Sequence, residues 1–261
     1  MSAWHMALLG LLVGSFANVM IHRLPRMVLN EETQDTYNLS RPASHCPHCQ
    51  TPLRWFHNIP VLSFLLLRGR CAHCQQHIAW RYPLIELSTA CVWWLCAWHW
   101  ASPQAALCWA LLGTGLLTLA VIDWDTTLLP DALTQPLLWL GLLASLMDWT
   151  ETPLNQSVAG AMVGYLSLWT VATVFKQLTR KEGMGAGDFK LLATIGAWLG
   201  PWLLWPVVLV ASVLGVVVGL WLRHRQGLRE GGYLPFGPFL AMAAATVAWF
   251  APTLLSWLWL A

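Results

Sequence analysis

Charged residues are scarce in this sequence. Only 10% of its 261 residues are Asp, Glu, Lys or Arg, whereas a soluble domain carries about 25%. Hydrophobic residues make up 57% of the chain. This excludes an ordinary water-soluble domain and indicates that most of the chain contacts a lipid bilayer. The 19 tryptophans agree, because indole rings favour the boundary between membrane and water.

Net charge is also small, at +2. A surface that binds nucleic acid needs a strong excess of positive charge, so we expect no nucleic-acid partner. The sequence has no internal repeat and no low-complexity stretch. A cleaved signal peptide is not needed, since the first apolar stretch can remain as a helix.

Apolar segments can be counted against the roughly 20 residues that a membrane-spanning helix needs. Gly200-Pro201 divides the longest segment in two, because proline ends or kinks a helix. The sequence therefore predicts an all-α polytopic membrane protein with about eight transmembrane helices. Their expected ranges are Ala3–Ile21, Pro83–Trp100, Ala105–Ile122, Ala132–Met147, Val158–Phe175, two within Phe189–Leu222, and Phe239–Trp259.

The positions of Lys and Arg test this count. All 14 lie in three regions, Arg23–Arg81, Lys176–Lys190 and Arg223–Arg229. Cytoplasmic loops carry the excess of Lys and Arg, so an even number of crossings must separate these regions. Eight helices with both termini outside satisfy that requirement. We expect three parts: a first membrane helix (1–22), a cytoplasmic loop domain (23–82) and a seven-helix membrane domain (83–261).

Two Cys-x-x-Cys pairs lie in the cytoplasmic loop. Cys46 and Cys49 form the first pair, and Cys71 and Cys74 form the second. This spacing is typical of a structural zinc site, because each tight turn brings two thiolates to one ion. Metal binding supplies folding energy to a loop too small to bury a core. The alternatives are a redox pair, unliganded cysteines, or a zinc site in which a nearby histidine (His45, His48, His73 or His77) replaces one thiolate.

Acidic residues at the ends of apolar helices are candidates for catalysis, because charge beside the membrane core is costly. Asp123 follows one apolar run and Asp188 opens another. The predicted topology puts both at the same depth on the cytoplasmic side. Two carboxylates in contact share a proton, and aspartyl proteolysis uses such a pair. Asp125 and Asp131 are possible substitutes for Asp123.

Asp188 lies in a glycine-rich segment with Gly183, Gly185 and Gly187. Glycines permit close backbone approach, so an extended substrate could lie beside this carboxylate. From the residues alone, two other roles remain open for Asp188: stabilising a helix N-terminus, or relaying protons or ions.

The blocks along the chain resemble those of the bacterial type IV prepilin peptidases, which are bifunctional leader peptidases and N-methyltransferases. The resemblance runs nearly end to end. Its blocks are Gly14–Val19 with His22–Pro25, the paired Cys-x-x-Cys motifs, Arg81–Leu87, Ile122-Asp123 with Leu129–Asp131, the GxGD signature Gly185–Asp188, and Pro235–Pro238.

The resemblance implies that Asp123 and Asp188 are the catalytic pair of a GxGD-class aspartyl protease. It implies a multi-pass protein of the bacterial inner membrane that serves type IV pili or type II secretion. The expected substrates are prepilins or pseudopilins, cut at the cytoplasmic membrane boundary after a glycine. By resemblance only, the new N-terminus is then methylated with S-adenosylmethionine.

Two other functions remain open from the residues alone. A proton-coupled transporter would use the same acidic pair, but it should show inverted repeats. An assembly scaffold built on the zinc loop would need no aspartate pair. Glu86, just inside the second helix, is expected either to contact the basic loop or substrate, or to lie at the membrane boundary.

Overall fold

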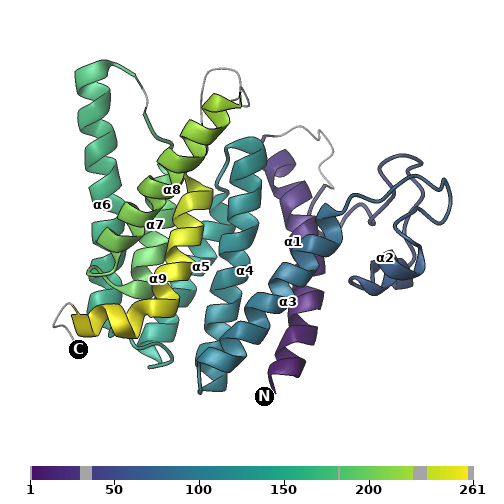
Figure 1. The fold of residues 1–261 in the computed structure, drawn as a ribbon, viewed down its shortest axis with the longest axis horizontal. Helices are drawn as coiled ribbons and strands as arrows, with labels where there is room; N and C mark the ends of the chain where they lie inside the picture. The colour runs from purple at the N-terminus through teal and green to yellow at the C-terminus, as the bar shows by residue number, and fades with distance from the viewer. Residues whose placement is uncertain (1, 30–36, 182, 226–233, 258–261) are drawn as a thin grey trace. The chain divides into compact units, whose positions relative to one another are not determined.

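The computed structural model describes residues 2–29, 37–181, 183–225 and 234–257. Within these residues the secondary structure is helical apart from two isolated β-bridges, so the all-α fold class is confirmed. The elements are α1 (Ala3–Val28), η1 (Trp55–Asn58), α2 (Leu62–Leu66), α3 (Arg81–His99), α4 (Pro103–Thr126), α5 (Asp131–Leu146), α6 (Leu154–Thr179), α7 (Ala186–Leu199), α8 (Leu204–His224) and α9 (Gly237–Trp257) (Figure 1).

Every predicted membrane helix corresponds to an observed one, namely α1 and α3–α9. Among the described residues, four helices are long and apolar enough to cross a membrane: α1, α4, α6 and α8. The helices α5 and α7 are shorter, with 16 and 14 residues. The number of eight crossings therefore stays a prediction. The expected end of the last helix at Trp259 lies outside the described residues.

The break at Gly200-Pro201 is confirmed. α7 ends at Leu199, and Gly200 follows with a φ of +74°. Glycine adopts this left-handed conformation without steric cost, and Pro201 cannot continue the helix. α8 then begins at Leu204.

Contacts between Cα atoms divide the chain into two compact units, Met1–Thr114 and Gly115–Ala261, and the boundary falls inside α4. The first unit holds α1, packed along α3, and the loop domain between them. Gly14 allows this packing, because a Cβ there would lie 2.8 Å from the Cα of Glu86. A larger residue at this position would push the two helices apart.

In the second unit, α7 forms the core. It contacts α5, α6, α8 and α9, and every residue from Asp188 to Leu199 except Lys190 is buried. A helix that is apolar on all sides is typical of such a position. The Trp198 side chain is fully buried, and its indole N–H donates to the carbonyl of Leu137 at 2.9 Å. The helix α7, which carries Asp188 in its first turn, is thus fixed by four neighbouring helices.

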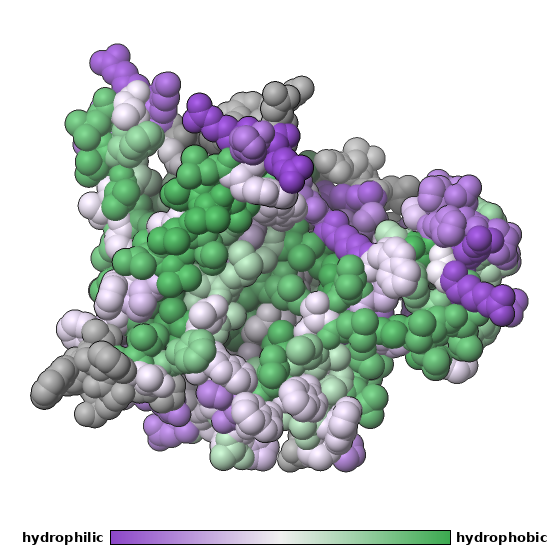
Figure 2. Space-filling model, in the orientation of Figure 1, coloured by the Kyte–Doolittle hydropathy of each residue, from purple (hydrophilic) through white to green (hydrophobic). Residues whose placement is uncertain are grey.

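The outer faces of the second unit are apolar. Large side chains such as Val171 on α6 and Leu209 and Leu220 on α8 are exposed, and Figure 2 shows hydrophobic surface along these two helices. Lys176 and Arg223 lie in the last turns of α6 and α8. This distribution suits helices whose sides contact lipid and whose ends reach water.

Candidate active site and metal centre

Each Cys-x-x-Cys pair in the first unit occupies a turn of the same construction. The carbonyl of Cys46 accepts from the N–H of Gln50 at 2.8 Å, and that of Cys71 accepts from the N–H of Gln75 at 3.1 Å. The glutamine that follows each pair has a positive φ, 55° and 59° respectively. The turns are also flanked by the two isolated antiparallel bridges, His45–Pro52 and Arg70–His77. The sequence therefore builds two matched turns that present thiols.

The four thiols of these turns converge. The Sγ atoms of Cys46, Cys49, Cys71 and Cys74 all lie within 4.8 Å of one another. Those of Cys46 and Cys74 are 3.8 Å apart, and none of the four is in a disulfide. Sulfurs about 2.3 Å from a tetrahedral zinc lie about 3.8 Å apart. The arrangement therefore fits a metal ion bound by four cysteines.

Hydrogen bonds, burial and the close approach of the thiols shift the pKa values of Cys49 and Cys74 in opposite directions. Hydrogen bonds from the side chain and backbone of Thr51 lower the pKa of Cys49 to about 6. The N–H of Gln76 lowers the pKa of Cys74, but burial and the three neighbouring thiols outweigh it and raise the pKa to about 11. A bound cation favours the thiolate form of a cysteine ligand.

The histidines near the turns are not part of the cluster. Among the described residues, the group of converging ligand atoms holds the four thiols and no imidazole. The Nδ1 of His45 instead lies 3.2 Å from the carbonyl oxygen of Ala43. The four-cysteine interpretation is therefore favoured over a histidine substitution.

Asp123 lies in the second unit, near the C-terminal end of α4. Its side chain is buried, with 4% exposed. The carboxylate Oδ2 accepts a hydrogen bond from the backbone N–H of Gly237 at 2.9 Å. Gly237 is the first residue of α9, and the first N–H groups of a helix have no partner within it. The N-terminus of α9, which favours negative charge, is thus directed at Asp123.

Gly237 has no space for a side chain. A Cβ at this position would lie 2.6 Å from Oδ2 of Asp123 and 3.2 Å from Cδ2 of Leu129. Glycine is required here by the close approach of the carboxylate.

Asp188 lies in the first turn of α7, and its side chain is 9% exposed. The N-cap of this helix is Gly185, so Asp188 does not occupy the capping position. Its Oδ1 is buried and has no hydrogen-bond partner among the described residues. Asp123 and Asp188 are close enough to interact electrostatically. A buried carboxylate oxygen with no partner is costly, which favours a role in chemistry over a role in helix capping.

Leu129 lies close to both Gly187, next to Asp188, and Gly237, which donates to Asp123. A Cβ on Gly187 would lie 2.8 Å from the Cβ of Leu129, and one on Gly237 would lie 3.2 Å from its Cδ2. The Leu129–Asp131 block, the GxGD segment and the Pro235–Pro238 block therefore meet at one place. All three lie in the second unit.

The two aspartates proposed as alternatives to Asp123 are not buried as Asp123 is. Asp125 and Asp131 are both exposed. Both carboxylate oxygens of Asp131 accept from Nζ of Lys190 at 2.7 Å, which forms an ion pair. Burial and the interaction between the carboxylates therefore favour Asp123 as the partner of Asp188.

The Gly237 hydrogen bond was not anticipated from the sequence. The Pro235–Pro238 block was noted only as part of the resemblance, with no role for its glycine. The sequence does contain one relevant feature: a glycine begins an apolar helix. The N–H of such a residue has no partner within the helix and can donate to a group outside it.

Comparisons with known proteins cover both units. The model of the type IV leader peptidase family matches residues 110–220, and that of the bacterial peptidase A24 N-terminal domain matches residues 8–100. Three relatives described as prepilin leader peptidase/N-methyltransferase are similar over most of their length. The one from Pseudomonas aeruginosa is 45% identical over 251 residues, 90% of this chain and 86% of the relative. The one from Neisseria gonorrhoeae is 43% identical over 252 residues, 91% and 86% of the two chains. The one from Dickeya chrysanthemi is 46% identical over 261 residues, 93% and 91%. No solved structure matches the chain.

Proposed function

Because the chain belongs to the type IV leader peptidase family, we propose that it is a membrane aspartyl endopeptidase of the bacterial inner membrane. It removes the leader peptide of type IV prepilins or pseudopilins and then methylates the new N-terminal residue. The relatives named above carry both activities in their names. The family is one of peptidases, and the comparisons give no support to a transporter.

The observation that carries the proposal is the buried pair of aspartates. Asp123 and Asp188 come from different helices, interact electrostatically and are both nearly inaccessible. Two such carboxylates cannot both ionise easily, so they share one proton. This is the state from which an aspartyl protease starts.

The hydrogen-bond partners of the pair suggest how the roles divide. The N–H of Gly237 donates to Asp123, and a hydrogen bond to the charged form of a carboxylate favours that form. Oδ1 of Asp188 has no partner among the described residues, so Asp188 is the better holder of the shared proton. Asp123 then takes a proton from water, the water oxygen attacks the scissile carbonyl carbon, and Asp188 gives its proton to the carbonyl oxygen. No covalent intermediate with the protein forms.

The surroundings of the site suit a prepilin. Such a substrate has a basic leader followed by an apolar helix, and the cut falls after a glycine at their junction. Asp123 ends an apolar helix and Asp188 begins one. A substrate helix that ends beside Asp123 and the first turn of α7 would bring its own polar junction to this level.

We propose zinc as the metal at the four-cysteine cluster. The support is the convergence of four thiols and the spacing of the Sγ atoms. Four thiolates close the coordination shell, which is typical of a structural zinc and leaves no position for a reacting water. The ion would therefore hold the loop domain together and take no part in cleavage.

The experiment that tests the peptidase is cleavage of a prepilin by the purified protein in detergent. Asp123→Asn and Asp188→Asn should each abolish cleavage, because asparagine keeps the shape of the side chain but cannot take up the proton. Zinc content should stay unchanged in both variants, since the cysteines lie in the other unit. Retained cleavage in both variants would overturn the proposed mechanism.

A further inference from the structure

The loop domain carries an exposed apolar surface that the peptidase chemistry does not use. In α2, Ser63 and Phe64 line the cavity between the loop domain, α1 and α3. The other three residues of α2 are exposed leucines, and η1, which contacts α2, adds two exposed aromatic side chains. Figure 2 shows hydrophobic surface on the lower side of the loop domain. We call these exposed side chains, together with Trp80, the α2 face; its members are Trp55, Phe56, Leu62, Leu65, Leu66 and Trp80.

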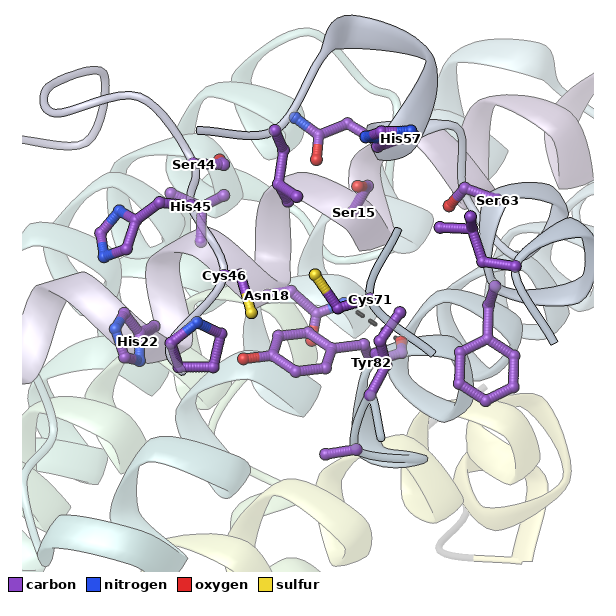
Figure 3. Close-up of a pocket in the computed structure, with 18 of the residues that line it drawn as sticks. Ser15, Asn18, His22, Ser44, His45, Cys46, His57, Ser63, Cys71 and Tyr82 are labelled. Atoms are coloured by element: carbon purple, nitrogen blue, oxygen red, sulfur yellow. Dashed lines mark hydrogen bonds between the residues drawn. The ribbon is translucent and has the colours of Figure 1, made fainter. Parts of the chain in front are cut away.

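The α2 face lies near the end of an apolar membrane helix. The indole of Trp80 packs on the ring of Phe64 with the centroids 4.8 Å apart, and α3 begins at the residue after Trp80. Asn18 of α1 donates from Nδ2 to the carbonyl of Tyr82 at 3.1 Å (Figure 3). Helix α1 is long and apolar enough to cross a membrane, and its apolar run ends close to Asn18, at Ile21. The α2 face is therefore at the level of the membrane boundary.

The charge around this face is positive. Between residues 37 and 85 the sequence has five Arg and no Asp or Glu. Zinc bound by four thiolates adds about two negative charges, so this stretch stays positive with the metal in place. Arg54, Arg68 and Arg70 are exposed and lie next to the α2 face in the sequence. The acidic residues of the loop all precede this stretch, at Glu31, Glu32 and Asp35.

A groove of about 680 Å³ lies against α2. Leu65 and Trp80 give it apolar walls, and Arg68 and His77 are its basic lining residues. None of its described lining residues is acidic. A phospholipid suits such a groove, because its phosphate can meet Arg68 while its acyl chain lies against Leu65 and Trp80.

We propose that the α2 face docks on the membrane surface and that its neighbouring arginines recognise anionic phospholipid. Leucines on one side of a helix with arginines beside them are typical of a segment that lies between headgroups and acyl chains. Tryptophan favours the same depth. The bilayer is favoured over a soluble partner, because the face lies beside helices that enter the membrane and its charge is opposite to that of anionic lipid.

The metal turns and α3 hold the α2 face in place. Both η1 and α2 lie between Cys49 and Cys71, so the four-thiol cluster closes the segment that carries them. The N–H of Val61, the N-cap of α2, donates to Oε2 of Glu86 at 2.8 Å and ties the start of α2 to α3. Loss of the metal should therefore release the face from the membrane, because the loop domain loses folding energy.

Photolabelling of the purified full-length protein in lipid nanodiscs tests this proposal. The probe is phosphatidylglycerol with a diazirine in its acyl chain close to the glycerol, diluted in phosphatidylcholine. Peptides within residues 54–68 and 76–81 should be labelled. The exposed side chains of Leu220 and Trp221 on α8 provide an internal standard in the same sample. Label on α8 without label on the two loop peptides would overturn the proposal, and so would crosslinks from these peptides to a second copy of the chain in place of lipid.

A matched pair of leucine variants tests the apolar contact. Leu66→Gln changes a side chain of the α2 face that is 75% exposed, and Leu178→Gln makes the same change at an 80% exposed position of the other unit. Leu66→Gln should lower the label on residues 54–68 about tenfold relative to α8, since burial of one leucine contributes about that factor. Leu178→Gln should leave it unchanged. Equal effects of the two variants would overturn the proposal.

A second pair tests the recognition of charge. Arg68→Gln should lower the label from the phosphatidylglycerol probe about fivefold, the effect of one arginine near an anionic surface. The matched control is Arg41→Gln, an exposed arginine that does not line the groove, and it should leave the label unchanged. In nanodiscs of phosphatidylcholine alone, with a phosphatidylcholine probe, Arg68→Gln should change the label by less than about twofold. Equal losses with both lipids, or in both variants, would overturn the recognition of anionic lipid, and zinc content measures whether each loop domain is folded.

Discussion

Replacing Gly237 by alanine should disable the peptidase without unfolding it. The new Cβ would lie 2.6 Å from Oδ2 of Asp123 and 3.2 Å from its Cγ, so the carboxylate must move away. That movement breaks the 2.9 Å hydrogen bond from the Gly237 N–H. A hydrogen bond to a charged group contributes about 1.5–3 kcal/mol, which corresponds to about 10- to 150-fold in rate. Misplacement of a reacting group by about 1 Å costs a further factor of about 100.

The assay is the steady-state rate of prepilin cleavage by purified variants in detergent. We expect kcat to fall at least about 100-fold, with little change in KM, because the substrate-binding surface is unaltered. The matched control is Gly215→Ala on α8, where the nearest atom to a new Cβ is Cδ2 of Phe239 at 3.6 Å. That variant should cleave like the wild type. Full activity of Gly237→Ala would refute the inferred contact between α9 and Asp123.

Further predictions concern the metal, the ion pair, the pH profile and the topology. Cys46→Ser should lower the zinc content and make residues 23–81 sensitive to protease, because a lost ligand removes folding energy; a well-folded wild-type protein without zinc would contradict this. Asp131→Asn should lower the unfolding free energy by less than about 1 kcal/mol and keep substantial cleavage, since its ion pair with Lys190 is exposed; complete loss of cleavage would make Asp131 a catalytic candidate again. Cleavage should follow a bell against pH, because it fails both when the pair holds two protons and when it holds none; a flat profile would argue against a shared proton. Reporter fusions should indicate the periplasm at Ser102, Thr152 and Ala261 and the cytoplasm at Thr51, Arg180 and Gly227; a cytoplasmic signal at Ala261 would break the even count of crossings.

The sequence was most informative about the helices. Apolar length and the Gly200-Pro201 break predicted α1 and α3–α9, because both features act locally along the chain. The end of α1 was the clearest difference, since the helix continues to Val28 and was expected to stop at Ile21. Hydropathy marks where a helix leaves the apolar layer, whereas the backbone hydrogen bonds continue through polar residues beyond it.

The candidate site was predictable only in part. The two Cys-x-x-Cys turns follow from a local spacing of cysteines, so the convergence of their four thiols could be expected from the sequence. The contact between Gly237 and Asp123 joins residues 114 positions apart, and no local pattern encodes it. Glu86 is different, because the sequence left two roles open: contact with the basic loop or substrate, or a position at the membrane boundary. Its hydrogen bond from the N–H of Val61 agrees with contact to the loop. Glu86 is buried, because α1 and α3 pack closely enough to enclose it.

The central claim is that Asp123 and Asp188 act together as an aspartyl pair. Its most direct test is prepilin cleavage by purified wild type, Asp123→Asn, Asp188→Asn and the exposed control Asp125→Asn, with zinc content measured in each. We expect cleavage by the wild type and by Asp125→Asn, no cleavage by Asp123→Asn and Asp188→Asn, and equal zinc content in all four proteins. Cleavage by Asp123→Asn together with its loss in Asp125→Asn would move the first catalytic position to Asp125. Cleavage by every variant would contradict the aspartyl mechanism.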